Sequence, residues 1–438
     1  MAVKNSKTKQ QASDQKKGLG KTQAKGQGGK TGFRFGKSGK DAGTGFKLGL
    51  DLEPGKYGKT GIIVLAVCAV VFIAAILWIY SGPILNGEEN IFWIYGDERI
   101  DFNSAVVKEI TKDDKRQEKT DEGAYTGSQE LSVVISGGHY KGRSITAYNY
   151  FGPLSGVPVK VGDSVMLTIK THTDGEISAT VYELNRIPVI AVFIVLFFVV
   201  VALVGGRTGI KSLVGLIITM VCLFAILIPL LVKGAPTIFT TFVVCAFVAM
   251  VSFVILGGVH RKTISAFLGT MAGALLAMLF GMTVQAIARI DGFRLDSAEP
   301  LLQLKYVGGV VRIKGLLVAG IVVSALGAVM DVAMSISSAL EEVHAANPSL
   351  SAKELFRSGM NIGRDMVGTM TNTLILAFLG SQFSLIIFLF ARNMTFNHLA
   401  STAFIALETI SGISASIGMV LAIPLTTLIA STLIVSKK

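Results

Sequence analysis

A carboxylate inside an apolar run is the first group in this chain that could do chemistry. Asp331 lies within the run Gly315–Leu340. Helical spacing places it on a face with Gly320, Ser324, Gly327, Ser335 and Ser338. A carboxylate in hydrocarbon costs at least ~2.5–3.5 kcal/mol, and small neighbours let another helix approach closely. The pattern predicts a polar seam inside a bundle of membrane helices.

Further polar groups occur in, or shortly before, the two apolar runs that follow. We predict that the seam comprises Asp331, Ser335, Arg364, Asp365, Asn372, Glu408 and Ser416. A polar path would then run from Glu408 at the outer boundary to Asp331, nearer the inner one. Two interpretations of Asp331 stay open. It couples an ion or a proton, or it pairs with Arg364 and only locks two helices together.

Composition identifies the class of protein that must position these groups. Of 438 residues, 51% are hydrophobic and only 16% are charged, against about 25% charged in a soluble protein. The apolar residues form runs long enough to cross a bilayer. We predict an all-α transmembrane bundle of eight helices, at Gly61–Tyr80, Ile187–Val204, Leu213–Val232, Pro236–Leu256, Ile264–Ala288, Lys314–Ser338, Met366–Ala391 and Gly412–Val435.

The chain begins with a strongly basic segment. Residues 1–59 hold fourteen Lys and Arg against four Asp and Glu and show no apolar periodicity. We predict a disordered cytoplasmic tail, followed by a transmembrane anchor at residues 60–80 that is not cleaved. Anionic lipid head groups are the partner predicted for this tail, and no nucleic acid is expected.

A polar insert separates the first two predicted spans. Residues 81–186 hold eleven Lys and Arg against sixteen Asp and Glu. Strand patterns occur at Glu130–Ile135, Arg143–Tyr148, Ser164–Ile169 and Ile177–Leu184, with turn formers between them. This spacing predicts a small β-barrel or sandwich. The charged stretch Lys108–Glu122 is interpreted as a loop or an exposed helix.

Basic residues in the loops predict the orientation. The tail and the loop at His260–Lys262 favour a cytoplasmic location, which places both termini inside the cell and residues 81–186 outside it. One outer loop weakens this orientation, because Arg289–Lys314 has five basic and three acidic residues. The last seven spans, within residues 187–438, then form the bundle in the cell membrane.

Several classes of function are disfavoured. The metalloprotease pattern HExxH, the hydrolase pattern GxSxG and a phosphate-binding loop do not occur. The three cysteines all lie in apolar runs and lack metal-ligand spacing. We therefore expect no enzyme activity, no cofactor and no metal site.

Two segments carry a family resemblance. Residues Asp331–Ser381 and Ser414–Ala430 resemble the signature of the YibE/F-like family of bacterial multi-pass membrane proteins. The matching motif positions are Asp331, Glu342, Arg364, Asp365, Asn372 and Pro424. The resemblance implies an eight-span integral membrane protein and defines topology better than activity.

Two functions fit these patterns. The first is a transporter or permease for a small solute or ion, in which the polar seam of the last three helices forms the route. The second is a membrane scaffold without transport, whose β insert docks an extracytoplasmic protein. In that case the seam joins a second membrane subunit or another copy of the chain.

Overall fold

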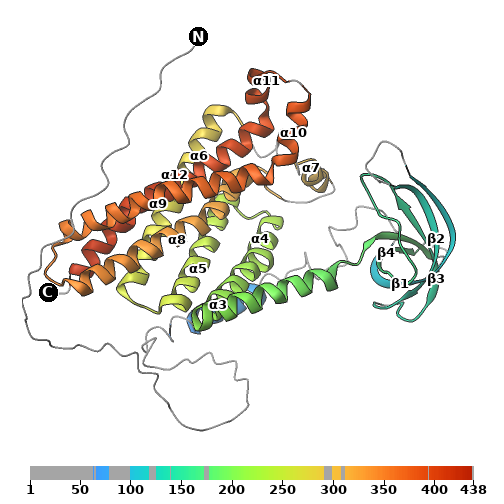
Figure 1. Cartoon of the computed structure of the whole chain (residues 1–438), viewed down its shortest axis with the longest axis horizontal. Coiled ribbons are helices and arrows are strands. Elements are labelled where there is room, and N and C mark those ends of the chain that lie inside the picture. Colours follow the sequence, from blue (N-terminus) through green and yellow to red (C-terminus); the bar gives the residue numbers. More distant parts are fainter. Residues whose placement is uncertain are drawn as a thin grey trace, which may run out of the picture. The chain divides into compact units, whose positions relative to one another are not determined.

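The computed structural model describes residues 63, 66–77, 99–117, 125–138, 140–171, 177–290, 298–306, 311–392 and 394–436. The predicted basic tail lies outside the described residues. Of the predicted anchor span, residues 60–80, the helix Ala66–Leu77 is described. After this helix the described chain has five strands, which are followed by helices (Figure 1).

The insert forms a closed five-stranded barrel. Its strands are β1 (Arg99–Gln117), β2 (Tyr125–Ile135), β3 (Ser144–Phe151), β4 (Ser164–Thr171) and β5 (Ile177–Leu184), in the order β1-β2-β3-β5-β4. All neighbours pair antiparallel except β3 and β5, which meet in parallel at Tyr148 and Thr180. This strand order is that of the OB-fold. Of the two predicted architectures, the barrel is therefore correct.

Residues 118–122 of the stretch predicted as a loop or exposed helix, Lys108–Glu122, lie outside the described residues. For the remainder of that stretch, strand β1 overturns the prediction. It extends to Gln117 and pairs with β2 over its second half. Ala105 and Val107 point inward and are fully buried. Register shifts between Val107 and Glu109 and between Ile110 and Lys112 interrupt the two-residue alternation. The bulges and the charged outer residues concealed the strand in the sequence.

Five described helices are long and apolar enough to cross a membrane: Ile187–Val232, Thr237–Gly257, Arg261–Ala288, Leu316–Ala346 and Ile405–Val435. A sixth span is formed if the pair Ala352–Ser381 and Phe383–Ala391, bent by 61°, is taken as one. The eight spans of the sequence analysis thus stay a prediction. The membrane character itself follows from these helices.

The first of these helices reverses direction within its length. It comprises α3 (Ile187–Val221), the π-helical turn η1 (Cys222–Leu227) and α4 (Ile228–Val232). Gly206 has φ 53° and ψ −134°, which is not helical. A Cβ on Gly209 would collide with the carbonyl oxygen of Val201, so the backbones on either side of Gly206 lie against each other. Side chains of both arms, from Ile190–Phe198 and Leu216–Val221, line one shared pocket.

Small residues make the closest helix contact of the bundle. The helices α6 (Arg261–Ala288) and α12 (Ala403–Val435) run antiparallel. Gly269 lies against Thr426, Gly273 against Ala422, Gly418 against Ala277 and Gly281 against Ser414. An advance of four residues along α6 therefore corresponds to a return of four residues along α12. Because the facing positions are small, the two backbones approach closely.

The helix that carries Asp331 lies among four neighbours. Helix α8 (Leu316–Ala346) contacts α5 (Thr237–Gly257), α6, α9 (Ala352–Ser381) and α12. Ile321, Val329 and Ile336 are buried in one hydrophobic cluster with α9 and α12 residues. Val322 and Leu326 are buried in another with α5 residues. Packing therefore covers α8 on these sides.

Helix α9 begins with a capping box. The Ser351 hydroxyl accepts from the Glu354 backbone N–H, and the Glu354 carboxylate accepts from the Ser351 N–H at 2.9 Å. Ser349 and Ser351 follow Asn347-Pro348, where α8 ends. The hydrogen bonds from Ser351 hold the pKa of Glu354 below its ordinary value of 4.5, because they favour the ionised carboxylate.

Replacing Ser351 with Ala is expected to loosen the start of α9. Loss of an N-cap typically costs about 0.5–2 kcal/mol of local stability. Hydrogen exchange over Ser351–Leu355, corrected for intrinsic rates, measures the loss.

Because the pKa of Glu354 is lowered on folding, its share of the stability is present above the unfolded-state pKa. It is lost as the pH falls through the folded value. The difference between wild type and variant should therefore shrink in acid; a constant difference would contradict a role for the carboxylate.

Candidate functional site

The structure places Asp331 on an outer face of α8. Asp331 is exposed, as are Gly320, Ser324 and Gly327 at helical spacing before it. A Cβ added to Gly320 or Gly327 would meet nothing within 4 Å. Ser335, one turn further along, is half-buried. We call Gly320, Ser324, Gly327 and Asp331 the α8 outer face. In the described part of the chain, the carboxylate of Asp331 forms no ion pair and no side-chain hydrogen bond.

The predicted polar residues of α9 are also exposed. Arg364, Asp365 and Asn372 all have exposed side chains. Arg364 donates a hydrogen bond to the side-chain oxygen of Asn361 at 3.3 Å. Within the described residues it forms no ion pair with Asp331. Arg364 thus bonds within its own helix, and the alternative of an Asp331–Arg364 lock is not the arrangement found.

Helix α12 holds the last two predicted residues in a different environment. Ser416 is buried and donates to the carbonyl of Gly412 at 2.8 Å. Glu408, one turn before Gly412, is half-buried. A Cβ on Gly412 would lie 3.2 Å from Phe378 of α9, so this part of α12 packs on α9. The seven predicted residues therefore divide between exposed faces of α8 and α9 and the interior beside α12.

A set of buried hydroxyls was missed by the sequence analysis. Its members are Thr263 and Thr270 of α6, Ser337 of α8, and Ser414, Thr426 and Thr427 of α12. Each is buried, and each hydroxyl oxygen lacks a hydrogen-bond partner among the described residues. Unpartnered hydroxyls in a helix interface are costly without water or an ion. The four-residue spacing Ser414, Gly418, Ala422, Thr426 was the available signal.

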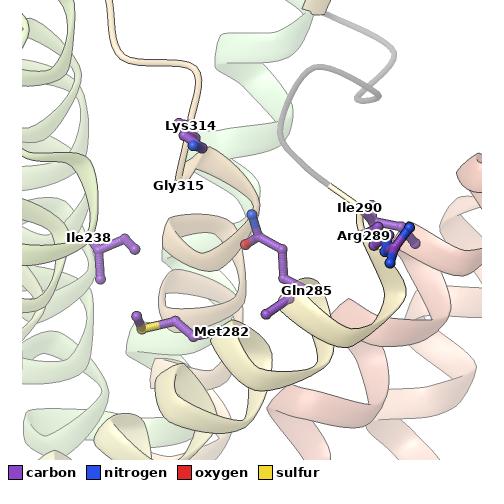
Figure 2. A pocket seen from close by; sticks show the side chains of 8 residues that line it. Ile238, Met282, Gln285, Arg289, Ile290, Lys314 and Gly315 are labelled. Atoms are coloured by element: carbon purple, nitrogen blue, oxygen red, sulfur yellow. The ribbon is translucent and has the colours of Figure 1, made fainter.

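A pocket of about 540 Å³ lies where α5 begins, α6 ends and α8 begins. That volume is within the range of about 300–1,000 Å³ typical of ligand sites. Ile238, Met282, Ala286 and Ile290 supply apolar surface, and Gln285, Arg289 and Lys314 supply polar groups. Figure 2 shows the Gln285 side chain extending from α6 toward the start of α8, where Lys314 and Gly315 lie.

Ordered backbone holds the start of α8 beside this pocket. The Thr237 hydroxyl donates to the carbonyl of Arg312 at 3.0 Å and ties the segment before α8 to the start of α5. Gly315 has φ 95°, and a Cβ there would lie 3.1 Å from Ile238. A side chain would therefore be strained both by the backbone and by the close approach of α5.

The end of α6 is equally well defined. Arg289 caps the helix in the left-handed conformation, with φ 52°, which costs a non-glycine residue roughly 1–2 kcal/mol. The following amide, that of Ile290, donates to the carbonyl of Gln285 at 3.2 Å, and the Ile290 side chain is buried. The burial of Ile290 anchors the turn that carries Arg289 to the pocket.

A model described as "YibE/F-like protein" matches residues 193–436, more than half of the chain. A second, "YibE/F family N-terminal domain", matches residues 101–184. The chain belongs to the YibE/F-like family. No curated protein and no solved structure matches it.

The matched ranges correspond to the two architectural parts. The N-terminal domain of the YibE/F-like family coincides with the barrel strands, and the longer match covers the apolar helices. The resemblance inferred from Asp331–Ser381 and Ser414–Ala430 is thereby confirmed. Residues 1–59 lie outside both matches. Family membership together with the apolar helices indicates a membrane protein, and neither names a substrate.

Proposed function

We propose that this YibE/F-like protein is a transporter of a small solute or ion and not an enzyme. The observation that carries the proposal is the exposed carboxylate of Asp331 beside Gly320 and Gly327 on a helix able to span a membrane. Contact with lipid would cost this carboxylate at least ~2.5–3.5 kcal/mol. Water or protein must therefore cover the α8 outer face, and a wet face that carries a carboxylate can accept a proton or a cation.

A flux measurement tests the proposal. The full chain, purified and reconstituted in proteoliposomes, should generate a current on a solid-supported membrane when a proton or cation gradient is imposed. Addition of the transported solute should change that current. Liposomes without protein are the control. Transport would be contradicted if neither current appeared and if no uptake of amino acids, organic acids, sugars or inorganic ions were detected.

The alternative is a scaffold in which protein covers the α8 outer face. It is favoured by the same glycines, because their open Cβ positions would admit a second helix closely. The partner would be a second copy of the chain or another membrane subunit. A cysteine placed at Gly327 should then form a disulfide between copies on oxidation in cell membranes, whereas one placed at Phe239, exposed on α5, should not. No cross-link at either position would count against the homo-oligomer.

The topology that accompanies this proposal has eight spans in the cell membrane, with both termini cytoplasmic and residues 81–186 extracytoplasmic. The segment Ile187–Val232 would be ~69 Å long as one straight helix of 46 residues, about twice the thickness of the hydrocarbon core. The reversal at Gly206 makes two spans of it. The helix Ala66–Leu77 would be the core of the first span. The bilayer, and anionic head groups at the basic tail, are the remaining proposed partners.

Thiol labelling should distinguish the two ends of the α3–α4 hairpin. Arg207→Cys lies at its cytoplasmic tip and Pro236→Cys beyond its far end, and both positions are exposed. A membrane-impermeant maleimide should label the cysteine at position 236 in intact cells and the one at position 207 only after permeabilisation. Cys68, Cys222 and Cys245 are buried and give a low background. Labelling of both from the same side would contradict the hairpin topology.

A further inference from the structure

The pocket between α5, α6 and α8 has an unbalanced charge. Two of its lining residues, Arg289 and Lys314, are cations with exposed side chains, and the described residues that line the pocket include no carboxylate. Neither charged side chain forms an ion pair or a hydrogen bond with a residue in the described part of the chain. Two such charges beside an apolar surface favour an anion from outside the protein, because opposite charges attract each other.

The chemistry of the lining narrows the class of anion. An arginine offers planar, paired donors that match the oxygens of a phosphate, and a lysine adds a point charge. The Gln285 amide supplies a further neutral donor on the side facing the start of α8. The apolar remainder of the lining, including Ile238 and Met282, suits a hydrocarbon or glycerol portion of the ligand.

We propose that this pocket binds a phosphate group, held by Arg289, Lys314 and Gln285. The phosphate belongs either to the head group of an anionic phospholipid or to a phosphorylated solute. Both sources present the same charged oxygens to the same three side chains. The site is separate from the α8 outer face, and it does not depend on whether the protein transports anything.

The backbone beside the pocket is held in place before a ligand arrives. Lys314 precedes Gly315, whose close contact with Ile238 fixes the chain at the start of α8. Arg289 follows the last turn of α6 and is held by the buried Ile290. These contacts fix the backbone that carries both cations, and their exposed side chains can turn toward a ligand.

The experiment uses the full chain after exchange into nanodiscs of neutral phosphatidylcholine. One arm adds phosphatidylglycerol and measures lipid retention by native mass spectrometry. The other adds inorganic phosphate or glycerol phosphate and measures binding by calorimetry. The double variant Arg289→Gln/Lys314→Gln should bind at least about a hundredfold more weakly, since each charged contact contributes about tenfold. The control is Arg312→Gln, a change of an exposed basic residue in the same segment that does not line the pocket.

Each outcome decides the proposal. Retention of phosphatidylglycerol alone assigns the site to a lipid head group, and binding in the phosphate arm assigns it to a solute. The proposal is overturned if the wild type binds the ligand in neither arm. It is also overturned if Arg312→Gln loses as much affinity as the double variant does. Hydrogen exchange on the wild type gives a reading independent of variant folding. The ligand should slow exchange at residues 285–290 and 311–318, and unchanged exchange there on binding would place the ligand elsewhere.

Discussion

Gly273→Ala is expected to destabilise the pairing of α6 and α12 by about 1–3 kcal/mol, the usual cost of overpacking a core. The added methyl group would lie 2.6 Å from Cβ of Ala422, 2.8 Å from Val329 and 3.0 Å from the carbonyl oxygen of Gly418. Two of these neighbours are backbone or Cβ atoms that cannot rotate away. The helices must separate, and the loss of close packing extends along the whole interface. Thermal unfolding in detergent and yield of monodisperse protein measure the effect.

A matched substitution separates packing from helix propensity. Gly368 lies in α9, and a Cβ there meets nothing within 4 Å. Gly368→Ala should be neutral or stabilising, because Ala favours the helix over Gly by about 1 kcal/mol. Ala422→Gly, combined with Gly273→Ala, should restore part of the stability by removing the nearest clash. Equal stability of Gly273→Ala and Gly368→Ala would contradict the close pairing.

The sequence predicted the components of this bundle better than their pairing. The GxxxG spacing of Gly269 and Gly273 is typical of a close contact somewhere on α6. The choice of α12 as partner depends on the matching series that ends at Thr426, which becomes a signal only when the antiparallel register is known. The pattern along one helix shows which face carries small residues. Only the contacts between helices show which helix packs against that face.

The same limit applies to charges. The basic residues of Arg289–Lys314 entered the sequence analysis only as an argument about orientation. Arg289 and Lys314 lie 25 positions apart in the numbering, and packing of α6 against α8 brings both to one pocket. Strand β1 shows a converse case, in which bulges removed the alternation that identifies a strand. In each instance a tertiary contact, absent from local pattern, determined the structure.

The polar seam illustrates where sequence reasoning ends. Helical periodicity correctly placed Asp331, Gly320 and Gly327 on one face of α8. Periodicity does not tell which neighbour covers that face, and the arrangement found leaves it open while α5, α6, α9 and α12 occupy the others. The seam had been expected inside the bundle. This polar face is uncovered in one chain, and a carboxylate in contact with lipid is costly. Whether water or protein covers the face is therefore the central question for function.

Asp331→Asn should answer that question, with an expected loss of ion-coupled transport of at least about tenfold. The asparagine keeps the shape of the side chain but removes the charge, and one charge-assisted contact contributes about 1.5–3 kcal/mol, equal to tenfold or more. Initial rates in proteoliposomes, at matched protein content, measure the effect. Glu299→Gln is the control, because Glu299 is an exposed carboxylate in the helix Ala298–Tyr306, outside the predicted seam and the family motif.

Oligomeric state distinguishes the two ways in which this variant could act. If water covers the α8 outer face, Asp331→Asn reduces flux and leaves the mass of the detergent-solubilised particle unchanged. If a second copy covers it, removal of the charge changes the dimer fraction, because a buried carboxylate contributes to a helix interface through its partner. Light scattering after size exclusion measures that fraction. Wild-type flux together with wild-type mass would show that Asp331 serves neither purpose, and it would leave the buried hydroxyls of α6 and α12 as the polar groups to test next.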